Sequence, residues 1–212
     1  MTHAIIGAGN IGSAVARRFV AAGLPVAVAA GRGPAAVAPL AEELGPLVTA
    51  AEVHDALAAD IVILAVPFEA VRGVVDQVPD WGGRIVVDAT NAIDYQTFSP
   101  ADLGGRPSSD LVADWAVNAR VVKSFGSTWA RVLARDPEVG GGRRVLFVSG
   151  DHQDANAEVA SLIEALGFAA IDLGRSDAGG LLQQFGGPLT TLSLISQPIG
   201  GATPAEMDVV DR

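Results

Sequence analysis

The sequence lacks cysteine altogether and has one lysine and one tyrosine among its 212 residues. Without cysteine the chain can form no disulfide bond and use no thiol nucleophile. It also lacks a hydrophobic run that approaches the roughly 20 residues needed to cross a bilayer as a helix. The first expected strand begins at about residue 3, which leaves no room for a signal peptide. These absences predict a cytoplasmic protein.

Acidic residues outnumber basic ones, and the formal net charge is −10 at pH 7. Such a chain repels phosphate groups, so we expect neither a nucleic acid nor an anionic membrane surface as a partner. Half of the residues are hydrophobic and only 18% are charged, a balance that supports a sizeable core and argues against global disorder. The length suits one large domain with at most a small appendage.

A glycine motif follows the first apolar segment. Residues 4–6 have the composition of a buried strand, and residues 13–22 that of a helix. Between them, Gly7 allows a tight turn and Gly9 has no side chain to keep a pyrophosphate from the backbone, while Gly12 lets the helix pack closely on the strand. The helix N-terminus would offer unpaired N–H groups to the anion. The alternative, glycines that serve only a turn, is less consistent with the strand before them and the helix after them. The motif therefore predicts a dinucleotide site.

Strand-like and helix-like segments alternate along most of the chain, which indicates βαβ units. The expected strands are 4–6, 25–30, 47–49, 60–66, 84–87, 119–125, 144–149 and 168–173. The expected helices are 13–22, 34–44, 51–59, 68–78, 108–118, 154–166, 176–184 and 189–195, with loops at 92–107 and 136–142. We therefore expect an α/β fold, a doubly wound and mostly parallel Rossmann sheet with a short C-terminal helical segment. Residues 1–185 would form the NADP-binding domain, and residues 186–212 a short helical or irregular segment.

The end of the second expected strand bears on the choice of dinucleotide. NAD-specific sites usually place Asp or Glu there to bind the ribose 2′-hydroxyl, but this chain reads Ala30-Gly31-Arg32-Gly33. An arginine can pair with a 2′-phosphate that a carboxylate would repel. The alternative is that Arg32 is an ordinary solvated arginine of a loop. We favour NADP.

Five motifs occur in a characteristic order along roughly residues 3–185. They are Gly7–Gly12, Gly31–Pro34, Ala65–Pro67, Asp88–Asn91 and Val121–Phe125. Together they resemble the NADP-dependent oxidoreductases typified by coenzyme-F420-dependent NADP oxidoreductase. Relatives of that family include the cytoplasmic reductase domains of transmembrane ferric reductases.

The resemblance implies NADP(H) as cofactor and assigns roles by position. The pyrophosphate would be held by Gly7, Gly9, Asn10, Ile11 and Gly12, and the 2′-phosphate by Gly31 and Arg32. The ribose and adenine side would be covered by Val66, Pro67 and Phe68, and the nicotinamide ribose would lie near Asn91. The acceptor pocket would be bordered by Phe125, Ser127, Thr128 and Trp129.

Two positions depart from the family pattern. Gly31 stands where relatives often carry Ser or Thr, so one hydroxyl contact to the phosphate is missing. Gly126 stands where the Val-Val-Lys-x-Phe run usually continues with Asn. The second change falls in the implied acceptor pocket and leaves the identity of the acceptor open.

The sequence offers no obvious catalytic acid, and we assign no catalytic residue. Lys123 lies within an expected strand, and Tyr95 lies in a loop without a lysine four residues on. We expect structural or solvated roles for His3, His54 and His152. His152 lies between Asp151 and Asp154, but residues this close in sequence rarely converge on a metal, so no metal site is expected.

The lack of an acid favours an acceptor that is itself a redox cofactor. A ketone or imine needs a positioned proton donor, whereas hydride exchange with F420 or a flavin mainly needs two rings held together without water. The alternatives are an NADPH-dependent reductase of a quinone, a ferric complex or a small carbonyl compound, and a non-catalytic NADP(H)-binding redox sensor. The apolar residues Leu181, Leu182 and 189–195 resemble a dimerising C-terminus in this family, so we also expect a homodimer.

Overall fold

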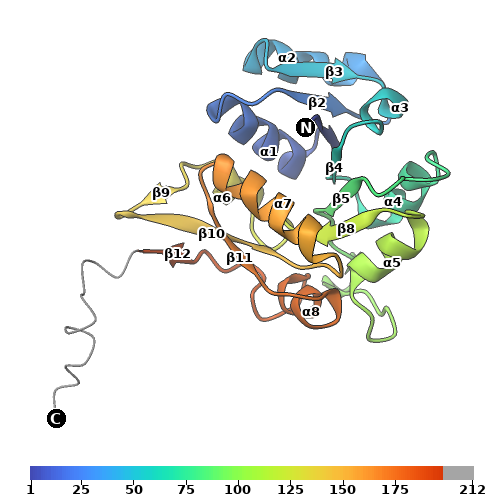
Figure 1. Cartoon of the computed structure of the whole chain (residues 1–212), viewed down its shortest axis with the longest axis vertical. Coiled ribbons are helices and arrows are strands. Elements are labelled where there is room, and N and C mark those ends of the chain that lie inside the picture. The colour runs from blue at the N-terminus through green and yellow to red at the C-terminus, as the bar shows by residue number, and fades with distance from the viewer. Residues whose placement is uncertain (198–212) are drawn as a thin grey trace.

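Six short apolar segments form the central sheet in a computed structural model that describes residues 1–197 (Figure 1). All six strands are parallel, in the order β3-β2-β1-β4-β5-β8. Their bounds are β1 His3–Ile6, β2 Val26–Ala29, β3 Val48–Ala51, β4 Ile61–Leu64, β5 Ile85–Asp88 and β8 Arg120–Lys123. The chain builds outward from β1 to β3 and then returns to the other side of β1, so the strand order reverses between β1 and β4. Ligands of open α/β sheets bind at the carboxyl ends of the strands beside such a point.

Helices cover both faces of this sheet, which is why its strands are apolar without alternation. Their bounds are α1 Asn10–Ala21, η1 Pro34–Ala36, α2 Ala38–Leu44, α3 Val53–Ala56, α4 Phe68–Val75, α5 Ser108–Trp115, α6 Ala130–Leu133 and α7 Gln153–Ala165. One core cluster includes Phe19 of α1, Leu133 of α6 and Ile163 of α7. The second includes Val71 of α4 and Val112 of α5. The expected α/β doubly wound sheet is therefore confirmed.

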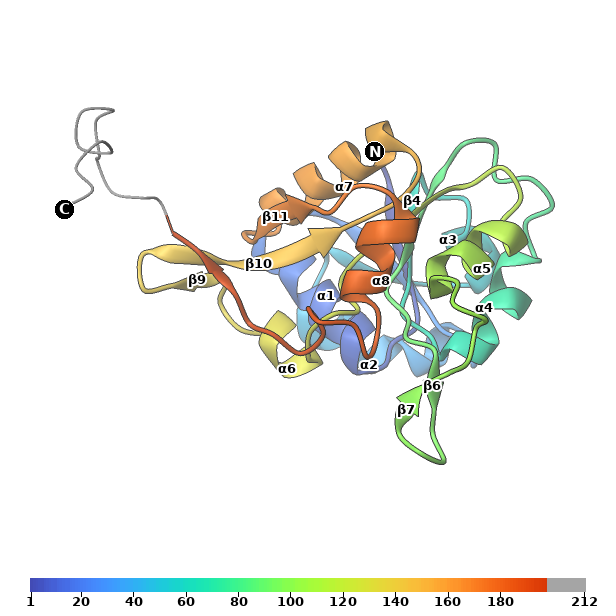
Figure 2. The ribbon, with the colours of Figure 1, turned by 90° about the horizontal axis from the view of Figure 1, so that it is seen from below.

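A smaller sheet continues from the edge of the main one. It contains β9 Glu138–Val139, β10 Gly142–Val148, β11 Ala169–Asp172 and β12 Ile195–Ser196. β11 is parallel to β10, while β9 and β12 are antiparallel to it. An antiparallel bridge between Lys123 and Ser149 connects the ends of β8 and β10. β9, β10 and β12 form an arm that extends away from the helices (Figure 2). Within residues 1–197, no helix has the length and apolar character that a membrane crossing requires.

Several expected elements differ in detail from those observed. The helix at 34–44 is divided into η1 and α2, and the helix at 51–59 shrinks to α3 because β3 extends to Ala51. The loop at 92–107 contains a small hairpin, β6 Ile93–Asp94 and β7 Ser99–Pro100, and the loop at 136–142 contains β9. The helix at 176–184 starts as a π-helix, η2 Ser176–Gly180, and ends as α8 Leu181–Gln183.

The helix expected over 189–195 is wrong. The backbone of this segment forms hydrogen bonds with distant parts of the chain and not the i to i−4 bonds of a helix. Thr191 N–H donates to Ser127 O, and Leu194 O accepts from Val145 N–H. Thr191 also has a left-handed backbone with φ of 66°, which an α-helix cannot accommodate. The segment therefore leads into β12, and the described residues contain no C-terminal helix after α8. The remainder of the predicted tail, residues 198–212, lies outside the described residues.

Candidate dinucleotide-binding site

The turn between β1 and α1 has the geometry expected of the glycine motif. Gly7 has φ of +116°, and its N–H donates to Ala29 O at 2.8 Å. A Cβ on Gly7 would overlap with the Ala65 carbonyl, and one on Gly12 with the Gly7 carbonyl. Nothing lies within 4 Å of a Cβ built on Gly9. The first and third glycines are thus required by close packing, whereas Gly9 leaves the backbone open beside the N-terminus of α1, as a bound pyrophosphate requires.

A hollow of about 490 Å³ runs from this turn between α1 and α6. Its lining includes Gly9, Asn10, Arg17, Trp129 and Arg131. Half of Trp129 is exposed, and the Arg131 guanidinium lies 5.5 Å from the centre of its indole ring. The sequence predicted a role for Trp129 but not for Arg131. The two side chains meet because both lie at the start of α6. An arginine two positions after a tryptophan was the sequence signal from which this contact could have been predicted.

The two arginines of this hollow have different partners. Arg17 donates to both carboxylate oxygens of Glu43, at 2.5 and 3.0 Å, and this bond raises the pKa of Arg17 and lowers the pKa of Glu43. Arg131 has no carboxylate within 4.0 Å in the part of the chain that the structure describes. Of the two arginines, Arg17 is thus paired with a carboxylate within the described residues and Arg131 is not.

A second hollow, of about 540 Å³, lies at the ends of β2 and β3. Gly31 and Gly33 line it together with Glu52, His54 and Asp55. Arg32 is exposed between the two glycines and does not line it. The hollow thus brings two carboxylates near the predicted 2′-phosphate position. Sequence reasoning missed this feature because it depends on the pairing of β2 with β3.

The residues predicted to cover the ribose and adenine lie just after β4. Val66 is half-buried and lies beside Gly7, since a Cβ on that glycine would be 3.2 Å from Val66 Cγ1. Pro67 is exposed and precedes α4. Phe68 is buried in the core against Trp115, with ring centres 5.7 Å apart. The accessible surface here is therefore that of Val66 and Pro67.

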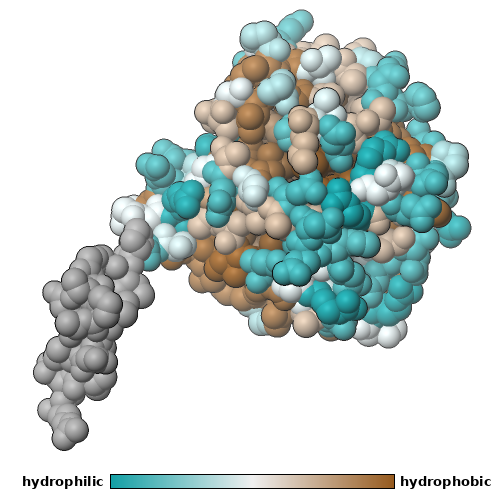
Figure 3. Space-filling model, viewed as in Figure 1, coloured by the Kyte–Doolittle hydropathy of each residue, from teal (hydrophilic) through white to brown (hydrophobic). Residues whose placement is uncertain are grey.

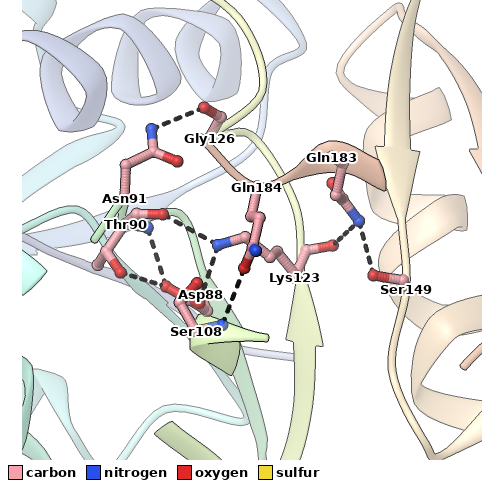
Figure 4. A network of polar contacts seen from close by, with 9 residues as sticks. All are labelled: Asp88, Thr90, Asn91, Ser108, Lys123, Gly126, Ser149, Gln183 and Gln184. Carbon is pink, nitrogen blue, oxygen red and sulfur yellow. Dashed lines mark hydrogen bonds and ion pairs between the residues drawn. The ribbon is translucent and has the colours of Figure 1, made fainter. Parts of the chain in front are cut away.

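A buried ion pair lies at the carboxyl ends of β5 and β8. Asp88 and Lys123 are opposite one another in the strand register, and Lys123 Nζ lies 3.0 Å from Asp88 Oδ2, with side-chain exposures of 1% and 0%. Lys123 Nζ also donates to Thr90 O at 3.0 Å, and Asp88 Oδ1 accepts from Thr90 N and Oγ1 (Figure 4). Sequence reasoning missed this network, although a lone lysine inside an apolar strand was a signal that a buried acid would be found nearby.

The loops after β5 and β8 are joined by Asn91 and Gly126. Asn91 Nδ2 donates to Gly126 O at 2.9 Å, while Asn91 Oδ1 is buried and has no partner within the described chain. Thr128 Oγ1 is likewise buried without a partner there. They belong to a set of nine such side-chain atoms among residues 1–197. Their place in the loops after β5 and β8, at the carboxyl ends of the strands, is what makes these two candidates for contact with a ligand.

The residues predicted to border the acceptor do not share one surface. Phe125 is 1% exposed and belongs to the core cluster with Val122, and its φ of 60° is unusual for a bulky residue. Ser127 is also buried, whereas Trp129 faces the hollow beside α1. Phe125 can therefore support the residues of this region from within the core, but it cannot contact an acceptor.

His3 has the setting of a structural side chain, whereas His54 lines the second hollow. The pKa of His3 is lowered, chiefly by burial, and its ring lies 5.2 Å from that of Phe19. Among residues 1–197, no group of three or more His, Cys, Asp or Glu side chains is placed to hold a metal ion.

Comparison with known proteins identifies similar chains. Residues 2–92 match the family described as NADP oxidoreductase, coenzyme F420-dependent. A hypothetical protein of Sinorhizobium meliloti is 54% identical, with a TM-score of 0.91 over 93% of this chain and 96% of that one. A protein of Arthrobacter sp. FB24 described as an F420-dependent NADP-reductase is 26% identical, with a TM-score of 0.68 over 82% of this chain and 85% of that one.

A curated relative is much longer than this chain. Metalloreductase STEAP3 of Rattus norvegicus is 25% identical over 170 residues, which are 80% of this chain and 33% of that protein. This chain therefore matches about a third of the length of that relative.

Proposed function

We propose that this chain, which belongs to the family described as NADP oxidoreductase, coenzyme F420-dependent, transfers hydride between NADP(H) and a deazaflavin or a flavin. The observation that carries the proposal is the open backbone at Gly9, which lies at the N-terminus of α1 and continues into the hollow beside Trp129. A dinucleotide and an aromatic acceptor could thus meet at one edge of the sheet.

The residues present fit NADP(H). The N–H groups at the start of α1 would bind the pyrophosphate, and Arg32 would pair with the 2′-phosphate. Val66 and Pro67 would lie against the adenosine side, and the unpartnered Asn91 Oδ1 would accept a hydrogen bond from the nicotinamide ribose. When bound, the reduced nicotinamide supplies the hydride.

The protein groups near the acceptor favour ring positioning over proton transfer. Lys123 is engaged by Asp88 and Thr90, so it is not free to protonate a carbonyl substrate. Trp129 offers an exposed indole face and Arg131 an unpaired positive charge. This combination suits a flat acceptor that carries a negative charge.

The test is to mix the purified protein with NADPH and oxidised F420, with FMN in parallel, and to follow the loss of acceptor absorbance. Rapid reduction of either acceptor supports the proposal and identifies the ring system. NADPH binding without reduction of either contradicts it and favours another acceptor or a non-catalytic redox sensor.

A ferric complex is the second candidate acceptor, because the relative from Rattus norvegicus is a metalloreductase. Ferric citrate, a quinone and a small ketone should therefore be assayed beside F420 and FMN. A sensor would bind NADP(H) tightly, turn over none of these compounds and change its oligomeric state with the cofactor.

We also propose that the protein is a homodimer in the cytoplasm. Among its exposed apolar side chains are Leu181, Leu182, Leu192 and Leu194. The view in Figure 3 includes hydrophobic surface at the lower left, next to where the described chain ends. A monomeric mass by light scattering at micromolar concentration would contradict the dimer.

A further inference from the structure

The Asp88–Lys123 pair is the most deeply buried charged pair found in residues 1–197. Charges lose hydration when buried, and apolar residues of similar volume commonly stabilise a protein as well as such a pair does. The pair is therefore weak evidence for a role in stability alone. Its place at the carboxyl ends of β5 and β8, where ligands of this sheet type bind, points to the binding site.

The network holds Thr90 by both its backbone and its side chain. Thr90 N–H and Oγ1 donate to Asp88 Oδ1 at 2.9 and 2.6 Å. Lys123 Nζ donates to Thr90 O at 3.0 Å, from the neighbouring strand. Three bonds thus fix the residue that directly precedes Asn91, and Figure 4 shows Thr90 joined to both Asp88 and Lys123.

The position of Asn91 then fixes the loop after β8. Asn91 Nδ2 donates to Gly126 O, and a Cβ built on Gly126 would lie only 3.1 Å from Ala89 O and 3.2 Å from Thr90 O. The two loops are therefore in close contact. A change in the turn at Thr90 would move both the amide of Asn91 and the peptide of Gly126.

Lys123 is itself held from the opposite side. Gln183 Nε2 donates to Lys123 O at 3.1 Å and to Ser149 Oγ at 2.7 Å. Lys123 thereby connects the main sheet with the end of β10 and with α8. These bonds hold the backbone of Lys123, while its ammonium group is held by Asp88 Oδ2 and Thr90 O. The side chain therefore extends toward Thr90 from a fixed backbone.

We propose that Lys123 is a positioning residue for the nicotinamide end of the dinucleotide. Through Asp88 and Thr90 it places the Asn91 amide, whose Oδ1 has no partner within the described chain, at a set distance from the loop after β8. This inference rests on the proposed NADP(H) site. It predicts that loss of the ammonium group weakens contacts to the nicotinamide half and leaves contacts to the adenosine half unchanged.

The test compares NADPH with 2′,5′-ADP, which has the adenosine phosphates but no nicotinamide. In Lys123→Met we expect the Kd of NADPH to rise about tenfold or more, and the Kd of 2′,5′-ADP to stay within about twofold. If the wild-type protein reduces an acceptor, its single-turnover rate should fall as well, since a displacement of about 1 Å can cost on the order of 100-fold. Equal losses for both ligands, or no loss for either, would overturn the proposal.

Further variants separate positioning from stability. Asp88→Asn combined with Lys123→Met leaves no unpaired buried charge, so stability should recover while the selective loss of NADPH affinity remains. Recovery of affinity together with stability would indicate a purely structural role. Ile163→Ala, on the buried face of α7, is the matched control and should lower stability without changing either Kd.

If Lys123→Met fails to fold, the NADPH affinity of Thr90→Val tests the proposal instead. It removes the hydroxyl bond to Asp88 and keeps the ion pair, and it should show a smaller selective loss of NADPH affinity; wild-type affinity would overturn the proposal. A wild-type protein that binds neither NADPH nor 2′,5′-ADP would instead contradict the proposed function itself.

Discussion

Arg32 lies exposed at the end of β2, and Glu52, which follows the adjacent strand β3, lines the hollow beside it. The two side chains bring opposite charges to the same corner of the sheet. A 2′-phosphate placed here would be attracted by the first and repelled by the second. We therefore predict that the relative affinities for NADPH and NADH depend on the difference between the two effects.

Arg32→Ala should weaken NADPH binding about 10- to 100-fold, because a charge-assisted hydrogen bond contributes about 1.5–3 kcal/mol. NADH has no 2′-phosphate and should bind nearly unchanged. Titrations of both dinucleotides measure this difference. Arg135→Ala, which removes an equal charge from an exposed position outside both hollows, is the control. Equal losses for NADPH and NADH would contradict the assignment of Arg32.

Glu52→Gln should have the opposite effect. Removing one negative charge from a solvated hollow should tighten NADPH binding about twofold, since charges separated by roughly 8 Å of water interact by about 0.5 kcal/mol. The gain should shrink as salt is added, because surface charges are screened. A weaker affinity for NADPH would instead mean that Glu52 binds the dinucleotide directly.

Arg131→Ala should reduce the discrimination between FMN and riboflavin. These acceptors share a ring system and differ by one phosphate group. If Arg131 attracts that phosphate, the variant should raise the KM for FMN about tenfold or more and change that for riboflavin little. Arg135→Ala again controls for net charge. A loss of NADPH affinity in place of FMN affinity would assign Arg131 to the dinucleotide pyrophosphate.

Gly126→Ala should destabilise the protein by about 1–3 kcal/mol, because the added Cβ would press against the carbonyl groups of Ala89 and Thr90. The free energy of unfolding in urea measures the effect. Gly73→Ala in α4, where a Cβ meets nothing within 4 Å, is the matched control and should be neutral or stabilising by about 0.5–1 kcal/mol. Equal stabilities for the two variants would mean that the loop after β8 adapts without cost.

His3 should make stability depend on pH below neutrality. Burial lowers its pKa in the folded protein below the ordinary value of 6.5, and the N-terminal amine acts in the same direction while Asp60 opposes it. The unfolded chain therefore binds the proton first, so the contribution of His3 to stability is complete above about pH 6.5 and is lost as the pH falls through the lowered pKa. Thermal unfolding at pH 7.5 and 5.5 should show a smaller decrease for His3→Gln than for the wild type. An equal decrease would exclude His3 as the cause.

Local composition was sufficient to predict most of the main sheet. Strands such as β1 and β4 are buried on both faces, so their apolar runs are visible in the sequence. The glycine turn was also predictable, because its three glycines have the spacing of a known strand–turn–helix motif, although the group that crowds Gly7 is the distant Ala65 carbonyl.

The parts that were missed depend on neighbours far away in sequence. Asp88 and Lys123 meet only because β5 and β8 are adjacent, and Arg131 reaches the glycine turn only because α6 packs beside α1. The segment at 189–195 has helix-like apolar content, but its backbone is bound by Ser127 and Val145. Local periodicity carries no information about such partners.

The bond between Thr191 N–H and Ser127 O has a consequence for the order of events during synthesis. The dinucleotide turn and the strands around it emerge early from the ribosome and can form before the rest of the chain exists. The loop that contains Ser127 must wait for the segment around Thr191 before its backbone is fully bonded. The glycine turn should thus form first, and the loop that contains Ser127 should be among the last regions of the described chain to reach its final form.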